Sequence, residues 1–254
     1  MADVYFSGQG KVYLGTRNSD GTFNAPLFVG NVPSLSVNLD TDVVEHKEST
    51  TGKRLPDLRL TREQRATVQM TLEDINSDNL ALMLHGTKRT IASSAVTNEA
   101  MPTAMAVGSL YKAAQEGLSA ISVVDSAGTP ATLVLNTHYK VVDAAFGLIE
   151  ILNIASFVQP FKINYTYAAR TQVPIFDAAA TERYIRYHGL NTANTNKKVL
   201  VEIYRVLFDP AQNMQLINDD VAQWEMTGSC LYDASREGTT ALGPFGRFSY
   251  VDAQ

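Results

Sequence analysis

Apolar and polar residues alternate with a period of two along four stretches of the chain, at 33–40, 65–73, 161–167 and 222–230. This alternation is typical of antiparallel strands that bury one face and expose the other. A shift of one residue would move each apolar set into water, so the pattern strongly specifies the register of these strands. Weaker strand signals lie at 10–15, 27–31, 120–125, 131–135, 139–143, 147–154, 183–188 and 198–208.

One helix is predicted, over 77–85. Its apolar residues recur at i, i+3 and i+4, namely Leu80, Met83 and Leu84. Ser77 or Asp78 can cap its first free N–H groups, and Gly86 is placed to end it in a left-handed conformation. Because strands and helices do not alternate, the pattern argues against a doubly wound α/β enzyme. The predicted fold is mainly β, an antiparallel β-sandwich or barrel with one short helix and an inserted small β-sandwich domain.

Two stretches of unusual composition divide the chain. The segment 40–65 is dense in charges of both signs, and 87–107 is rich in Ala, Ser, Thr and Met with almost no strand signal. We interpret 87–107 as a linker into an inserted β-rich domain at 90–170. That insertion leaves 1–89 and 171–254 as the two parts of one core domain.

The charged segment 40–65 is predicted to be an extended loop, because long loops in compact domains are usually functional or disordered. It has two interpretations. It could be a long solvated hairpin, or it could be an arm that reaches a neighbouring subunit and pairs its charges across an interface. The candidate inter-subunit residues are Glu45, Lys47, Glu48, Lys53, Arg54, Asp57, Arg59 and Arg62.

Charge and composition restrict the function. The 254 residues carry 21 Lys and Arg against 26 Asp and Glu, a net charge of -5, which argues against a protein that grips nucleic acid through its phosphates. This mild negative charge does not exclude a protein that lets nucleic acid pass without gripping it. No run of about 18 apolar residues occurs, so no membrane span is predicted.

No constellation of catalytic or metal-binding residues stands out in the sequence. None of the histidines has a His or Cys neighbour at metal-ligand spacing. The single cysteine, Cys230, falls on the apolar face of its strand, which favours a buried, unreactive thiol. We therefore predict that the chain is not an enzyme and holds no cofactor or metal. The four histidines are His46, His85, His138 and His188.

The side chains on the polar faces of the predicted strands are short and almost all uncharged. One interpretation is the solvent face of an antiparallel sheet. The other is the smooth, hydrated wall of a channel, because such side chains would neither bind an anionic polymer nor obstruct it. The candidate channel-lining residues are Ser34, Ser36, Asn38, Thr67, Gln69, Thr71, Glu225, Thr227 and Ser229.

The order of strand, charged loop, amphipathic strand, short Leu-rich helix and insertion resembles that of the tail tube proteins of long-tailed bacteriophages. The resemblance lies in patterns rather than in a chemical signature. It covers most of 1–86 and extends less clearly over 108–168 and 183–233. The segments that carry it are 30–37, 45–54, 66–74, 79–86, 138–143 and 147–152.

The resemblance implies stacked hexameric rings whose strands join into one β-barrel that conducts DNA without binding it specifically. It implies a virion location after synthesis in the host cytoplasm, and no membrane. The partners it implies are other copies of the chain and the tail terminator, tape measure and baseplate proteins. Arg65 departs from the pattern, since it falls in line with a candidate lumen face. It is expected either to pair with Glu73 or Glu225, or to mark that face as outward.

Three alternatives stay open. A baseplate or distal tail ring subunit could share the same core. A β-sandwich carbohydrate-binding module would need a planar row of exposed aromatic residues, whereas Tyr184 and Tyr187 fall on opposite faces of their strand. A hydrolase on a β-scaffold would need acidic residues or histidines that converge in space.

Overall fold

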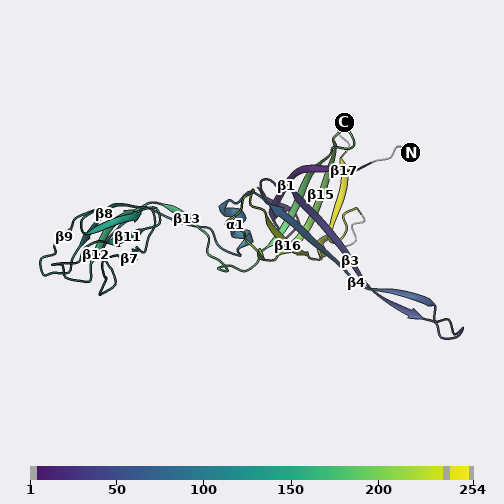
Figure 1. The fold of residues 1–254 in the computed structure, drawn as a ribbon. Coiled ribbons are helices and arrows are strands. Elements are labelled where there is room, and N and C mark those ends of the chain that lie inside the picture. Colours follow the sequence, from purple (N-terminus) through teal and green to yellow (C-terminus); the bar gives the residue numbers. More distant parts are fainter. Residues whose placement is uncertain (1–4, 237–240, 252–254) are drawn as a thin grey trace. The chain divides into compact units, whose positions relative to one another are not determined.

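A computed structural model describes residues 5–236 and 241–251 (Figure 1). Strands make up 51% of it and helical turns 4%, and the sheets are antiparallel, so the predicted mainly β fold with one short helix is confirmed. The chain forms two compact units, which we call the core unit (1–88 with 173–254) and the inserted unit (89–172). These bounds lie within two residues of the insertion predicted at 90–170.

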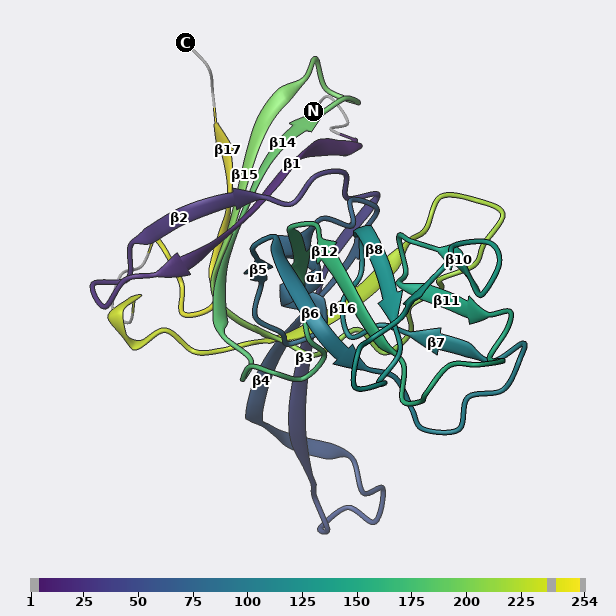
Figure 2. The same cartoon turned by 90° about the vertical axis from the view of Figure 1, so that its left-hand side faces the viewer.

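The core unit contains one large antiparallel sheet of eight strands. Its order is β2-β1-β14-β15-β16-β4-β3, and β17 also pairs with β15. β15 is long enough to pair with β16 at its C-terminal end and with β17 nearer its start (Figure 2). The described strands form an open sheet rather than a closed barrel. The strands are β1 (Gly8–Arg17), β2 (Phe23–Phe28), β3 (Ser34–Lys47), β4 (Pro56–Leu72), β14 (Glu182–Asn191), β15 (Lys197–Phe208), β16 (Trp224–Cys230) and β17 (Gly246–Val251).

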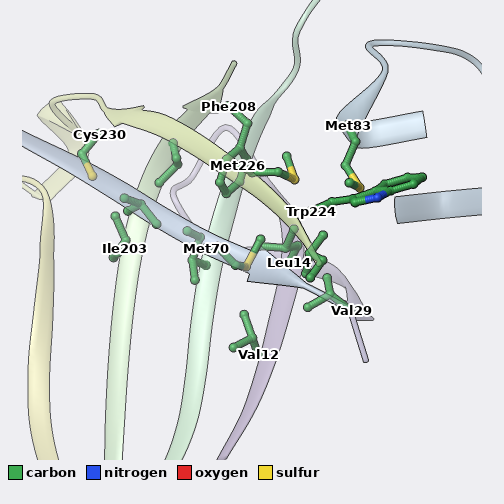
Figure 3. Close-up of a cluster of buried hydrophobic side chains, with 14 of the residues drawn as sticks. Val12, Leu14, Val29, Met70, Met83, Ile203, Phe208, Trp224, Met226 and Cys230 are labelled. Atoms are coloured by element: carbon green, nitrogen blue, oxygen red, sulfur yellow. The ribbon is translucent and has the colours of Figure 1, made fainter. Parts of the chain in front are cut away.

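The hydrophobic core of this unit lies on one face of the large sheet (Figure 3). The alternating residues of β4 and β16 that were predicted to be apolar and buried are buried, among them Val68, Met70 and Met226. Met83 of the helix α1 (Ser77–Met83) lies in the same cluster as Trp224, so α1 covers this end of the sheet. A short 3-10 turn, Ala234–Arg236, follows β16.

The ends of α1 differ from the prediction. Asn76, and not Ser77 or Asp78, is the N-cap, because its side chain accepts hydrogen bonds from the N–H groups of Asp78 and Asn79 at 3.0 and 2.9 Å. The left-handed residue is His85, with φ of 47°, rather than Gly86. A Cβ on Gly86 would lie 2.0 Å from the carbonyl oxygen of Pro174, so the glycine is needed for close approach of two backbones.

Two segments contain strands that the prediction of a loop and a linker did not include. The segment 40–65 is mostly a hairpin, one of its two interpretations, rather than a loop, since β3 and β4 stay paired from Ser34 opposite Thr71 to Lys47 opposite Pro56. The segment 87–107 is not an unstructured linker, because it contains two strands of the inserted unit, at 89–91 and 94–100. Its small polar residues give a weak strand signal, and hydrogen bonding to a partner strand overrides it.

The inserted unit has two main sheets, ordered β6-β12-β8-β9 and β10-β11-β7, and a separate pair, β13-β5. Phe161, Ile163 and Tyr165, which alternate in the sequence, are buried in its own core. Its strands are β5 (Arg89–Ile91), β6 (Ser94–Ala100), β7 (Leu110–Lys112), β8 (Leu118–Val124), β9 (Thr132–Leu133), β10 (Tyr139–Asp143), β11 (Leu148–Ile151), β12 (Lys162–Tyr167) and β13 (Arg170–Gln172).

The base of the inserted unit allows a clean excision. Arg89 and Gln172 lie directly opposite each other in the β5–β13 pair. Replacing 90–171 with Asn-Gly joins these two positions by a two-residue hairpin turn. We expect the shortened chain to keep the core fold, because each unit has its own hydrophobic cluster. Circular dichroism and a single cooperative thermal transition check this, and a molten chain would contradict it.

Candidate assembly surfaces

The nine candidate channel-lining residues come together in the structure. They lie on three adjacent strands, β3, β4 and β16, in rows of directly opposed residues, and opposed residues project from the same face of a sheet. We call this three-by-three array the polar lattice. Its rows are Ser34–Thr71–Glu225, Ser36–Gln69–Thr227 and Asn38–Thr67–Ser229.

The polar lattice occupies the face opposite the hydrophobic core, since its residues alternate with Val68, Met70 and Met226. Ser36, Thr71 and Thr227 are half-buried, and the other six members are exposed. Glu225 is its single charged member, and no lysine or arginine falls within its three rows. The array is therefore a hydrated, nearly neutral surface without a positive charge of its own.

Arg65 borders the lattice, opposite Asp40. Of the two alternatives given for it, the pairing with Glu73 or Glu225 does not occur. Its guanidinium lies 2.5 Å from the Glu63 carboxylate, and that hydrogen bond holds the pKa of Glu63 below its usual value. Glu73 instead accepts a hydrogen bond from the Gln223 side chain at 2.8 Å and another from Asn31. The Arg65 side chain is therefore charge-compensated by neighbouring acids.

The outer part of the β3–β4 hairpin projects beyond the rest of the core unit (Figure 1). We call residues 43–61 the arm. It begins at a bulge where Asp42 opposes Glu63 and Val43 opposes Thr61, so Arg62 has no directly opposed residue. Such bulges bend a strand and increase its twist. The arm is thus a distinct, redirected extension of the sheet.

The candidate inter-subunit residues are spread along this extension rather than gathered at one point. Glu45 opposes Arg59, and Lys47 opposes Pro56. Asp57 contacts the Nδ1 atom of His46 at 2.6 Å. The three residues in the turn between the strands are Glu48, Lys53 and Arg54, and the bulge holds Arg62.

Glu48 orders the tip of the arm. Its carboxylate accepts hydrogen bonds from the backbone N–H groups of Thr50 and Thr51 at 2.7 and 2.9 Å, and from both hydroxyl groups. These bonds, led by that of the Thr51 side chain, lower the pKa of Glu48 to about 2. The carboxylate is therefore ionised near neutral pH, and the turn is shaped before any partner arrives.

The arm also carries apolar side chains that reasoning from charge overlooked. Val44, Leu55, Leu58 and Leu60 are 41, 55, 50 and 54% exposed. Leu58 and Leu60 alternate with Arg59, a two-residue period that could have identified a strand within 40–65. Both charged and apolar groups of the arm are thus available to a partner.

A groove of about 650 Å³ opens on the core face of the large sheet. It is bordered by β3 and β4 on one side and by β1, β14, β15 and β17 on the other. Val37 and Leu39 of β3 line it and are 41 and 81% exposed, although the strand pattern predicts them on a buried face. Sequence reasoning missed this groove, because alternation shows which face is apolar but not whether anything covers it.

Among the described strands, β2 and β3 lie at the two ends of the large sheet. β3 pairs with β4 alone, so its other backbone edge has no strand beside it in the described part of the chain. Exposed edges invite pairing with another chain unless they are protected. β3 thus contributes to the polar lattice, the arm, the groove and an open edge.

The described part of the chain shows little that points to catalysis. Within it, no three His, Cys, Asp or Glu side chains come close enough together to hold a metal ion. Cys230 is buried on the apolar face as predicted, and burial raises the pKa of its thiol to about 11. No helix among the described residues has the length and hydrophobicity needed to cross a membrane.

The buried acids of the core unit have structural partners. Glu202 is 6% exposed and lies 2.6 Å from Arg247 and 3.7 Å from Arg186. Burial pushes the pKa of Asp233 up, but hydrogen bonds from Arg17, the shorter at 2.6 Å, bring it below the usual value. These ion pairs join strands and segments of the core.

These features define a mainly β protein with an antiparallel core sheet and an inserted β-rich unit. The chain belongs to the family described as Protein of unknown function UCP028589, whose model matches residues 5–249. No curated protein matches it.

Proposed function

We propose that this chain is a structural virion protein that self-assembles into stacked hexameric rings, which form the tail tube of a long-tailed bacteriophage and conduct its DNA. The polar lattice is the observation on which the proposal rests most. In the tube, the lattices of successive subunits line the lumen. The protein acts by assembly and not by catalysis.

The chemistry of the lattice suits a conduit for DNA. Proteins that hold DNA do so mainly by neutralising its phosphates with Lys and Arg, and the lattice has neither. Its Ser, Thr, Asn and Gln side chains keep the wall hydrated, and Glu225 and the net charge of -5 disfavour phosphate binding. DNA therefore moves along this wall without being held by it.

The open sheet explains why assembly is favoured. Pairing the edges of neighbouring subunits around a ring satisfies backbone groups that β3 leaves free, and it removes an edge that otherwise promotes aggregation. A barrel of many strands encloses an aqueous channel. The arm extends far enough to bridge subunits, and the inserted unit decorates the exterior.

The proposal also implies a set of partners. Other copies of the chain form the tube, and tail terminator, tape measure and baseplate proteins contact its ends or its lumen. A distal tail ring subunit would use the same surfaces but stop at single rings. Electron microscopy distinguishes the two, because long tubes from the purified chain favour a tube protein.

Lysines placed in the lattice test its position. We expect tubes of the Gln69→Lys, Thr71→Lys variant, assembled with short double-stranded DNA, to protect that DNA from nuclease, because many rings then present positive charge to it. Wild-type tubes should protect much less. The readout is the amount of full-length DNA that survives digestion.

A matched control places two lysines outside the lattice, at Leu216 and Ile217, which are 81 and 96% exposed. DNA bound by those lysines should remain digestible. Equal protection by both variants, or none by the lattice variant, would reject the assignment of the lattice to the lumen.

A further inference from the structure

The groove of the core unit is a mainly apolar surface, with Glu202 and Arg247 also in its lining, that the described residues leave open. Leu35, Val37 and Leu39 share one face of β3, the face that elsewhere packs into the core. Leu35 packs against the core, whereas Val37 is 41% and Leu39 81% exposed. The apolar face of β3 thus runs past the point where its own chain can cover it.

The arm carries an apolar face of its own. Val44 opposes Leu60, and His46 opposes Leu58, so these side chains project from the same side of the hairpin. Leu58 and Leu60 are half or more exposed, as is Leu55 beside the turn. An exposed set of large apolar side chains on a two-stranded ribbon is costly unless a partner covers it.

The arm cannot fill the groove of its own chain. β3 lines the groove at Leu39 and then runs on through Lys47, still paired with β4. At about 3.3 Å per residue of extended strand, Val44 lies about 17 Å and Lys47 about 26 Å beyond Leu39 along β3. The arm therefore extends away from the groove of its own chain, and the arm of a second copy can reach that groove.

We infer that the apolar face of one copy's arm, formed by Val44, Leu58 and Leu60, docks in the groove of a second copy. The inference deepens the proposed self-assembly and rests on it. A site of about 650 Å³ is of the size that holds a compact apolar group, and the ordered turn at Glu48 limits the entropy lost on docking.

The contact is heterologous, since each copy offers one arm and one groove. A heterologous contact repeats from copy to copy, and it closes into a ring or continues as a helical polymer. Blocking the arm and blocking the groove should therefore have the same effect on assembly. A copy with a blocked arm and a copy with a blocked groove should also still bind each other once, through the one intact arm and the one intact groove.

The test uses two full-length variants with substitutions at exposed positions. The arm variant is Leu58→Asp with Leu60→Asp, and the groove variant is Leu39→Asp with Phe248→Asp, where Phe248 lines the groove and is 52% exposed. Leu216→Asp, at an 81% exposed position outside both surfaces, is the control. Thermal melts by circular dichroism establish that each variant folds, and sedimentation velocity measures the assembly state.

We expect the wild type and the control to assemble and each double variant to stay monomeric. An equimolar mixture of the two variants should give dimers and nothing larger, because one intact arm meets one intact groove. Assembly of the wild type together with assembly of either double variant would show that the docking is wrong. A wild type that assembles and a mixture that stays monomeric would show the same. In both cases the proposed function stands. If the wild type itself never assembles, the proposed function fails and the docking fails with it.

Discussion

Removing the arm should leave a folded monomer that polymerises only at a much higher protein concentration. Replacing residues 43–62 with Asn-Gly joins Asp42 to Glu63, which already oppose each other across the hairpin, through a type I′ turn. The core cluster contains no residue of the deleted segment, so the core should keep its stability. Losing a contact that contributes about 3 kcal/mol raises the assembly concentration by roughly 100-fold. Sedimentation velocity over a concentration series measures it.

Excision of 90–171 provides the matched control, because it also removes a large part of the chain. That variant should still form tubes if the inserted unit only decorates them. Normal tubes from the arm deletion would show that the arm has no part in assembly. Loss of tubes from the excision variant, with its core folded, would show that the inserted unit does more than decorate.

Substitution of two buried phenylalanines should show that the two units unfold independently. Phe208 is 2% exposed in the core-unit cluster, and Phe161 is 0% exposed in the inserted-unit cluster. Replacing either with alanine leaves a cavity and costs about 3–5 kcal/mol, a large part of a domain's stability. Phe208→Ala should destabilise the core and prevent assembly. Phe161→Ala should destabilise the inserted unit alone.

Denaturant unfolding followed by near-ultraviolet circular dichroism, with tube formation scored in parallel, checks this. Each variant serves as the control for the other. We expect two unfolding transitions. Phe208→Ala should shift only the transition of the core unit, and Phe161→Ala should shift only that of the inserted unit. A single transition that shifts equally in both variants would mean that the units unfold together, and tube loss from Phe161→Ala would tie the inserted unit to assembly.

Much of the large sheet could be predicted because its strands have one apolar and one polar face. The alternation around Val68 and around Met226 specified both which residues are buried and which side chains share the other face. It did not specify which strands are neighbours. The polar lattice joins segments more than 150 residues apart, and backbone pairing that no sequence pattern encodes brings them together.

The errors have physical causes. Charged side chains obscured the strands of 40–65, yet the hydrogen bonds of that hairpin come from the backbone and do not depend on them. Asn76, Ser77 and Asp78 are all good capping residues, and Asn76 is the one whose backbone is still extended where α1 begins. Leu39 has the pattern of a core residue, but it is 81% exposed, because none of the described residues packs over that part of β3.

The central claim is that the purified wild-type chain forms a hollow polymer by itself. Negative-stain electron microscopy of the full-length protein, with its mass measured in parallel, tests this most directly. We expect six-subunit rings stacked into tubes with an open lumen. A homogeneous monomer of 27.7 kDa at every concentration would contradict it.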